Sequence, residues 1–291
     1  MNKLMVAAAT ALLAAGMCEA QQSSNANAGK TQAPAQQAPA PQAPATQAAP
    51  AGPKVPQAKS QEEFKAYQNV MSLQDPVAMD NAATEFATKY PDSELREVMF
   101  QQLCTVYDAA GASDKAVELA RRTLQINPNN PVALVTLAGN LAEHTKENDL
   151  DRNERLDEAI GSANKALGLI SNMSLPANYT PQQASQIKDM LRSWSYDAIG
   201  MASYMQKAYP AAEEAFTKSA DLQKARPNPV TYLRLSLAQD KLEKYTAALA
   251  SVDQCLASAP KGSPVENLAK QEKERLTKLA AATPNAAAPA K

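Results

Sequence analysis

The sequence contains few aromatic residues and few glycines: its 291 residues include four Phe, one Trp and nine Gly. Valine and isoleucine are scattered and never alternate with polar residues along a run, so no segment has the pattern of a β-strand. Alanine is abundant instead, and a core of Ala, Leu and Met suits closely spaced helices. We therefore expect an all-α protein.

Neither sign of charge predominates in the sequence. The chain has 29 basic and 30 acidic residues, which gives a formal net charge of -1. Its one basic block is the pair Arg121-Arg122. Nucleic-acid binding depends on clustered Lys and Arg, so we expect no nucleic-acid partner.

Residues with catalytic or metal-binding chemistry are scarce. His144 is the single histidine, and no second histidine or nearby pair of cysteines completes a zinc site. No Gly-rich phosphate loop and no G-x-S-x-G motif occurs. These absences predict a protein that is not an enzyme and holds no metal and no cofactor.

One acidic stretch resembles the start of a calcium-binding loop, Asp149-x-Asp151-x-Asn153. Such a loop needs Gly at its sixth position and a bidentate Glu at its twelfth, but Glu154 and Ile160 stand there. We therefore interpret this stretch as a solvated charged loop that precedes a helix.

The first 20 residues have the features of a signal peptide: Lys3, an apolar run from Leu4 to Met17, and Cys18-Glu19-Ala20 as a cleavage site. The apolar run is shorter than the ~20 residues of a membrane-spanning helix. We expect cleavage after Ala20 and export to the periplasm or the exterior, with no transmembrane segment. The alternative is a lipid anchor on Cys18, although the bulky Met17 precedes it where bacterial lipoproteins usually have Gly or Ala.

Residues 21–59 are rich in Pro, Ala and Gln and contain no acidic residue. So few apolar side chains cannot offset the entropy of ordering, and we expect a disordered linker that acts as a tether. We expect the same of the tail, residues 282–291.

Residues 97–130 show the repeating unit, which is two amphipathic helices separated by Gly111 and followed by a proline. Its spaced positions are Phe100, Leu103, Cys104, Tyr107, Ala116, Ala120, Thr123 and Pro128. Similar spacings recur three times downstream, which predicts a stack of helical hairpins. Cys104 and Cys255 occupy small-residue positions in the first and last units, so we expect packing thiols that are not bridged.

From about residue 94 to residue 281 the chain resembles the tetratricopeptide repeat (TPR) family. The fourth unit matches with Tyr232, Leu235, Ser236, Ala248, Val252, Cys255 and Pro260, and the third with Tyr196, Gly200, Tyr209, Ala212 and Phe216. The second unit has a charged insertion around Glu147 to Arg155. The resemblance implies a right-handed α-α superhelix over residues 60–281. It would hold about four hairpins, an N-terminal half-unit within 62–90, and a capping helix from Pro264 to about Ala281.

In TPR proteins the first helices of the hairpins line a concave groove that binds protein partners. The resemblance places these residues there: Gln101, Thr105, Asp108, Val135, Asn140, Trp194, Asp197, Met201, Tyr204, Leu233, Arg234 and Leu237. Relatives that bind a C-terminal carboxylate use Lys, Asn and Arg, and this chain has the Arg alone. The groove is apolar around Trp194, Met201, Tyr204, Met205 and Leu233. Trp194 either faces the groove or packs inside against residues 171–180, with Leu175 and Tyr179.

Three functions follow. The first is a non-enzymatic scaffold of the cell envelope or exterior that binds a partner peptide or helix in the apolar groove. The second is a structural or self-associating component of an envelope complex, lipid-anchored if Cys18 is modified. The third is a regulatory domain for an envelope enzyme. The identity of the partner and the oligomeric state stay open at this point.

Overall fold

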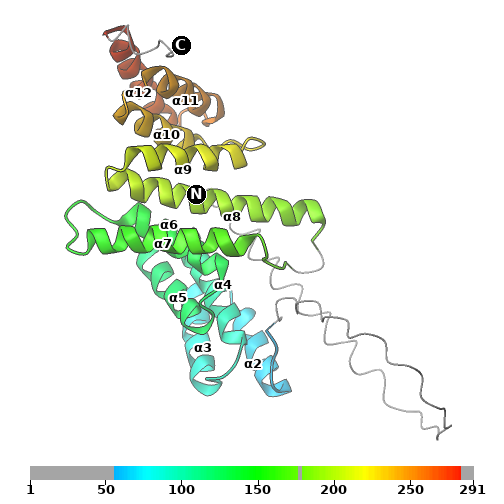
Figure 1. Cartoon of the computed structure of the whole chain (residues 1–291). Coiled ribbons are helices and arrows are strands. Elements are labelled where there is room, and N and C mark those ends of the chain that lie inside the picture. Colours follow the sequence, from blue (N-terminus) through cyan, green and yellow to red (C-terminus); the bar gives the residue numbers. More distant parts are fainter. Residues whose placement is uncertain (1–55, 176–178, 283–291) are drawn as a thin grey trace, which may run out of the picture.

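The structure is a computed structural model in which residues 56–175 and 179–282 are described. Within these residues the chain is entirely helical, with eleven helices and no strand. Figure 1 shows that the helices stack in chain order into one elongated array. This confirms the predicted all-α superhelix. The expected signal peptide (1–20), nearly all of the linker and the tail from residue 283 lie outside the described residues.

Four helical hairpins and a capping helix form the body of the array. They are α4 (Leu95–Ala109) with α5 (Ser113–Ile126), α6 (Pro131–His144) with α7 (Arg152–Ile170), α8 (Pro181–Met205) with α9 (Tyr209–Leu222), α10 (Pro229–Lys241) with α11 (Tyr245–Ser258), and α12 (Pro264–Ala282). The two helices of each hairpin make the most extensive contacts in the fold. The hairpins are the ones that the repeat spacing predicts.

Small side chains lie where the two helices of a hairpin meet. The fully buried ones include Ala116, Ala120, Ala138, Ala159, Ala163, Ala212 and Ala248. A Cβ atom added to Gly200 would lie 2.6 Å from the Phe216 ring. That distance is shorter than any normal carbon–carbon contact, so only glycine lets α8 and α9 approach this closely. The predicted register of the repeats is correct.

Turn geometry repeats between the two helices of three hairpins. Gly111 ends the first turn with φ of 76°, and Lys207 and Glu243 occupy the same place in the third and fourth hairpins with φ of 63° and 58°. This left-handed conformation suits glycine and costs other residues energy. The C-terminal hairpins therefore carry mild backbone strain that the first hairpin avoids.

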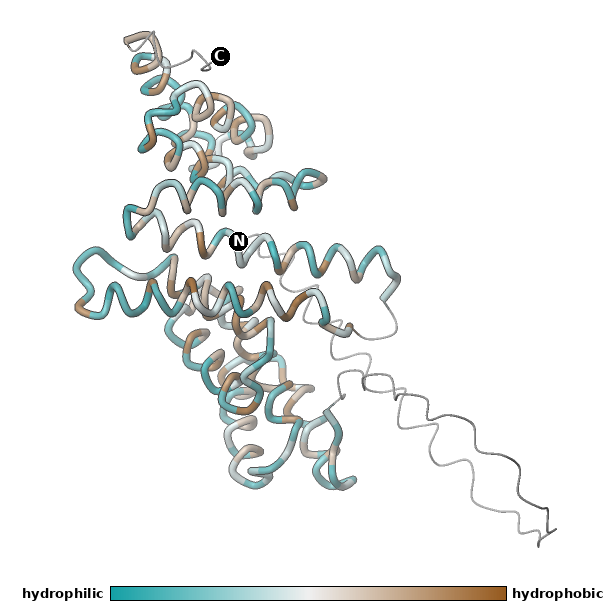
Figure 2. Tube along the Cα trace, in the orientation of Figure 1, coloured by the Kyte–Doolittle hydropathy of each residue, from teal (hydrophilic) through white to brown (hydrophobic). Residues whose placement is uncertain are grey.

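The middle of the array is longer than its neighbours. Helix α7 has 19 residues and α8 has 25. Thr180 and Gln183 form a capping box at the start of α8: the Thr180 hydroxyl accepts from the Gln183 amide at 3.2 Å, and the Gln183 side chain accepts from the Thr180 amide at 2.9 Å. The charged insertion forms most of the α6–α7 loop, which is largely hydrophilic (Figure 2), and the first turn of α7.

The N-terminal segment differs from the prediction of a half-unit. It contains two helices, α2 (Gln61–Met71) and α3 (Pro76–Lys89). The side chain of Ser60 caps α2 by accepting from the Glu63 amide at 3.1 Å, and Asp75 caps α3 by accepting from the Ala78 amide at 2.8 Å. Capping therefore starts two separate helices where the apolar spacing indicated one.

Cys104 and Cys255 are buried and free, as predicted. Burial raises the pKa of the Cys104 thiol to about 12 and that of Cys255 to about 11, so neither thiol forms a thiolate at neutral pH. In residues 56–175 and 179–282 no three His, Cys, Asp or Glu side chains gather as metal ligands. No helix of that part of the chain has the length and apolar character needed to cross a bilayer.

Candidate functional site: an apolar cavity between α8 and α10

The first helices of successive hairpins lie side by side, but not equally closely. Helix α6 packs extensively against α8, whereas α8 and α10 make few contacts with each other. Helix α9 contacts both α8 and α10 from behind. The structure therefore leaves a hollow between α8 and α10, with α9 beneath it.

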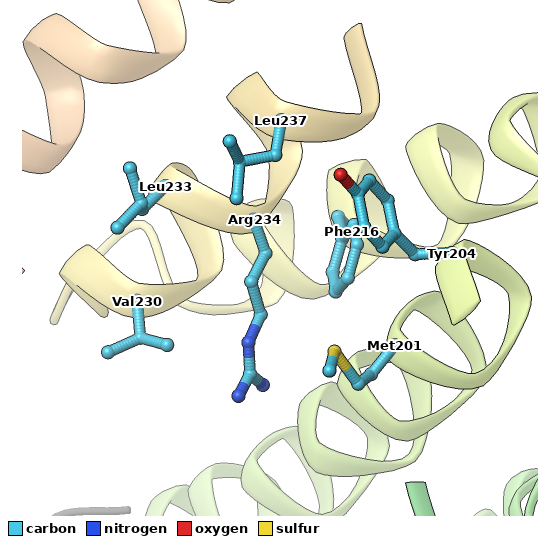
Figure 3. A pocket seen from close by; sticks show the side chains of 7 residues that line it. All are labelled: Met201, Tyr204, Phe216, Val230, Leu233, Arg234 and Leu237. Atoms are coloured by element: carbon cyan, nitrogen blue, oxygen red, sulfur yellow. The ribbon is translucent and has the colours of Figure 1, made fainter. Parts of the chain in front are cut away.

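This hollow is an apolar cavity of about 240 Å³ that opens to the surface on one side. Figure 3 shows its walls, with residues of α8 and α10 facing each other across it. The lining residues are Met201, Tyr204, Phe216, Val230, Leu233, Arg234 and Leu237. Five of the twelve residues predicted for the groove meet here: Met201, Tyr204, Leu233, Arg234 and Leu237.

Phe216 forms the floor of the cavity and is 1% exposed. Its ring can lie against α8 because Gly200 carries no side chain. The Tyr204 ring packs edge-on against Tyr209, with the centroids 5.4 Å apart, which holds one wall. The close approach of α8 and α9 at Gly200 therefore determines where the Phe216 ring lies beneath the cavity.

Beside the cavity a charged group links three first helices. Arg234 of α10 reaches Glu143 of α6, with its two terminal nitrogens each 3.4 Å from the Glu143 Oε1 atom. On α8, Asp197 accepts from the Thr231 hydroxyl at 3.0 Å. Burial raises the pKa of the Asp197 carboxyl to about 6, although the positive charge of Arg234 acts in the opposite direction.

Four other predicted groove residues lie between α4 and α6 and are bonded to the protein itself. The Asn140 side chain donates to the Asp108 carboxylate at 2.6 Å, and Asn130 donates to Gln101 at 2.6 Å. Thr105 donates back to the Gln101 carbonyl at 2.9 Å. Burial raises the pKa of Asp108, and the Asn140 hydrogen bond opposes that shift.

Trp194 and Val135 lie apart from the cavity. Val135 belongs to a buried cluster with Leu134, Ala166, Ile170 and Leu191, and the half-buried Trp194 packs against it. Met173, from the segment between α7 and α8, packs against the same cluster. Trp194 therefore packs against this cluster and keeps part of its side chain exposed, and Leu175 and Tyr179 are not members of the cluster.

Three residues of the site are not in the predicted set. Phe216 was recognised as a packing residue of the third unit, and its four-residue spacing from Ala212 gave no sign that it also forms a cavity floor. Val230 lies one turn before Leu233 and Arg234 on α10 and also lines the cavity. Glu143 gave no signal, because its partner Arg234 is 91 positions away in the sequence.

Comparison with known proteins finds likeness in structure alone. No protein-family model matches the chain, and no curated protein matches it in sequence. Among solved structures it is similar to TTC0263, a TPR protein of Thermus thermophilus, with 14% identity, 73% of this chain and 97% of that chain covered, and a TM-score of 0.44.

It is also similar to PilW, described as a widely conserved type IV pilus biogenesis factor, with 18% identity, coverage of 78% and 96%, and a TM-score of 0.44. The MamA protein gives 14% identity, coverage of 67% and 97%, and a TM-score of 0.40. The chain itself is a stack of helical hairpins that pack through small buried side chains.

Proposed function

We propose that the protein is a non-enzymatic scaffold that binds a segment of a partner protein in the cavity between α8 and α10. The observation that supports this proposal is the cavity itself, apolar and open on one side, on the face formed by the first helices. Burying an apolar side chain there removes both surfaces from water and stabilises a complex.

The side chains that line the cavity are suited to a recognition surface. Met201 and Tyr204 are half-buried, so both can contact a ligand and both are held by the fold. Methionine adapts its shape to different partners, and tyrosine combines apolar area with a hydroxyl group. A peptide or helix that carries one large apolar residue has the chemistry to bind here.

Site-specific photo-crosslinking tests this proposal. A photoreactive amino acid in place of Leu237 in the full chain should crosslink a partner in cells, and the same replacement of Leu268, a 55% exposed leucine on α12, should not. The change Leu237→Asn should weaken recovery of that partner at least about tenfold, because it places an amide in the apolar cavity. Equal crosslinking from both positions, or recovery unaffected by Leu237→Asn, would contradict the proposal.

We further propose that the scaffold acts outside the cytoplasm. This rests on the pattern of Lys3, the apolar run to Met17 and the small residues at Cys18 and Ala20. N-terminal sequencing of the protein from its native host should begin at Gln21. A mature chain that begins with a diacylglyceryl-modified Cys18 would establish the lipid-anchored alternative, and an unprocessed Met1 would contradict export by this signal.

A further inference from the structure

More carboxylates than cations border the cavity on the groove side. Four carboxylates form a row beside it: Glu143 on α6, Asp197 on α8, Asp240 on α10 and Glu272 on α12, where Arg275 contacts the last two. Two cations contact this row in the described part of the chain. They are Arg234, which contacts Glu143 at 3.4 Å, and Arg275 of α12, which contacts Asp240 at 2.6 Å. Four acidic groups against two basic ones leave the row with excess negative charge.

Arg234 is the cation that lines the cavity, but it already interacts with two carboxylates. Its guanidinium contacts Glu143, and its charge also acts on Asp197. Arg275 is similarly occupied, since it contacts Glu272 at 2.7 Å as well as Asp240. Neither arginine is free to pair with an acidic ligand without giving up a partner within the protein.

Glu143 lies close enough to the neighbouring carboxylates to influence their titration. Burial is the main cause of the raised pKa of both Asp108 and Asp197, and the charge of Glu143 raises both further. On the other side of the cavity, Asp240 and Glu272 add in the same way to the effect of burial on the pKa of Tyr204, one of the lining residues. A positive charge placed at either rim would therefore be attracted by carboxylates from more than one helix.

We propose that the cavity binds a partner segment in which one large apolar side chain is flanked, within a helical turn, by Lys or Arg. This inference rests on the proposed function and names the chemistry of its ligand. An apolar cavity of about 150 Å³ can hold benzene, so the present volume of about 240 Å³ accommodates a leucine, methionine or phenylalanine side chain. The flanking cations meet the carboxylate row.

Two segments of the chain near the groove or in the linker do not have this chemistry. Residues 21–55 contain no acidic residue and have Lys30 and Lys54, but their largest apolar side chain is Val55. The fully exposed Leu150 of the α6–α7 loop is large enough, yet Asp149 and Asp151 flank it and would be repelled by the carboxylate row. The ligand that we propose is a segment of a different protein.

Fluorescence anisotropy with three synthetic peptides tests the inference on the full chain. The peptides share one Leu-x-x-Leu pair in an Ala/Gln background and differ in their flanking positions, which are Lys, Gln or Glu. The Lys peptide should bind about tenfold more tightly than the Glu peptide, with the Gln peptide between them. The difference should shrink in ~0.5 M salt, because salt screens exposed charges.

Two variants, each with a control, show which residues cause the preference for the Lys peptide and which cause binding itself. Glu143→Gln should reduce the preference for the Lys peptide about two- to fivefold, because it removes one carboxylate and releases Arg234. The matched control Glu85→Gln, at an exposed position of α3, should leave the preference unchanged. Leu237→Asn should weaken all three peptides, and Leu268→Asn none of them.

The outcomes separate this inference from the proposed function. Equal affinity for the three peptides, or tighter binding of the Glu peptide, overturns the inference, and it leaves the proposed function standing if Leu237→Asn still abolishes binding. Failure of all three peptides to bind, or binding that Leu237→Asn does not affect, overturns both.

Discussion

The α4–α6 half and the α8–α10 half of the groove are packed in different ways. Between α4 and α6, polar side chains bridge the helices: Asn140 bonds to Asp108 and Asn130 bonds to both Glu97 and Gln101, at 2.6 to 2.7 Å. Between α8 and α10 the Thr231 hydroxyl donates to Asp197, but beside this bond apolar side chains face each other across a cavity. In the α4–α6 half the polar side chains bond to one another, whereas in the α8–α10 half an apolar cavity stays accessible.

This difference explains why the predicted groove residues do not form a single site. Side chains whose hydrogen bonds are already satisfied within the protein gain little from a ligand, because new bonds would replace existing ones. Partly exposed apolar side chains do gain, because a ligand removes them from water. Ligand binding should therefore be concentrated between α8 and α10, while the α4–α6 half keeps the array rigid.

The largest expected effect comes from closing the gap that Gly200 leaves for Phe216. Gly200→Leu should lower the free energy of unfolding by about 3 kcal/mol, because a Cβ atom alone would already lie 2.6 Å from the ring. Urea unfolding measures this change. The control is Gly161→Leu on α7, where nothing lies within 4 Å of an added Cβ, and it should not destabilise the protein. Equal effects of the two changes would show that the α8–α9 contact is not tight.

The second-largest effect is expected from removing the polar bridge between α4 and α6. Asn140→Ala removes the donor to the partly buried Asp108 carboxylate and should lower the free energy of unfolding by about 1.5–3 kcal/mol. Thermal unfolding at neutral pH measures it. Thr231→Ala removes the matching donor to Asp197 in the α8–α10 half. A smaller loss for Asn140→Ala than for Thr231→Ala would contradict the view that the α4–α6 half is the more firmly closed.

The free energy of unfolding should also depend on pH because of Asp197, which lies in the α8–α10 half. Its pKa is raised to about 6 in the folded protein and is ~3.9 in an unfolded chain, so the unfolded state loses its proton first as pH rises. The resulting stabilisation, on the order of 2 kcal/mol, is present below about pH 4 and is lost as pH rises through 6. Unfolding of the wild type and of Asp197→Asn between pH 4 and 7.5 isolates this contribution. A difference between the two proteins that does not change with pH would contradict it.

The smallest effect concerns the turns. Gly111 in the first hairpin has the left-handed backbone that Lys207 and Glu243 adopt in the third and fourth. Lys207→Gly should therefore raise the free energy of unfolding by about 0.5 kcal/mol, since relief of strain exceeds the added entropy of the unfolded chain. Calorimetry can detect such a shift. Glu214→Gly, inside helix α9, serves as the reverse control and should destabilise the protein.

The sequence was sufficient for the hairpins because their signals are local. Small residues such as Ala120 and Ala248 recur at fixed offsets, and caps such as Thr180 lie next to the helices that they start. The separate helix α2 was missed because its cap at Ser60 adjoins the proline-rich segment. The partners of the groove residues could not be predicted from their neighbours in the sequence. Whether Asp108 is bonded to Asn140, or Arg234 to Glu143, depends on which helices stack and how closely.

Selective observation of Met201 tests the central claim most directly. The chain has ten methionines, and their methyl groups can be labelled with ¹³C and followed by NMR while the Lys-flanked peptide is added to the full chain. If the cavity binds the peptide, the Met201 methyl signal shifts in step with binding, and the signals of Met71 on α2 and Met173 before α8 stay in place. Binding that shifts Met71 or Met173 and leaves Met201 unchanged would contradict the account.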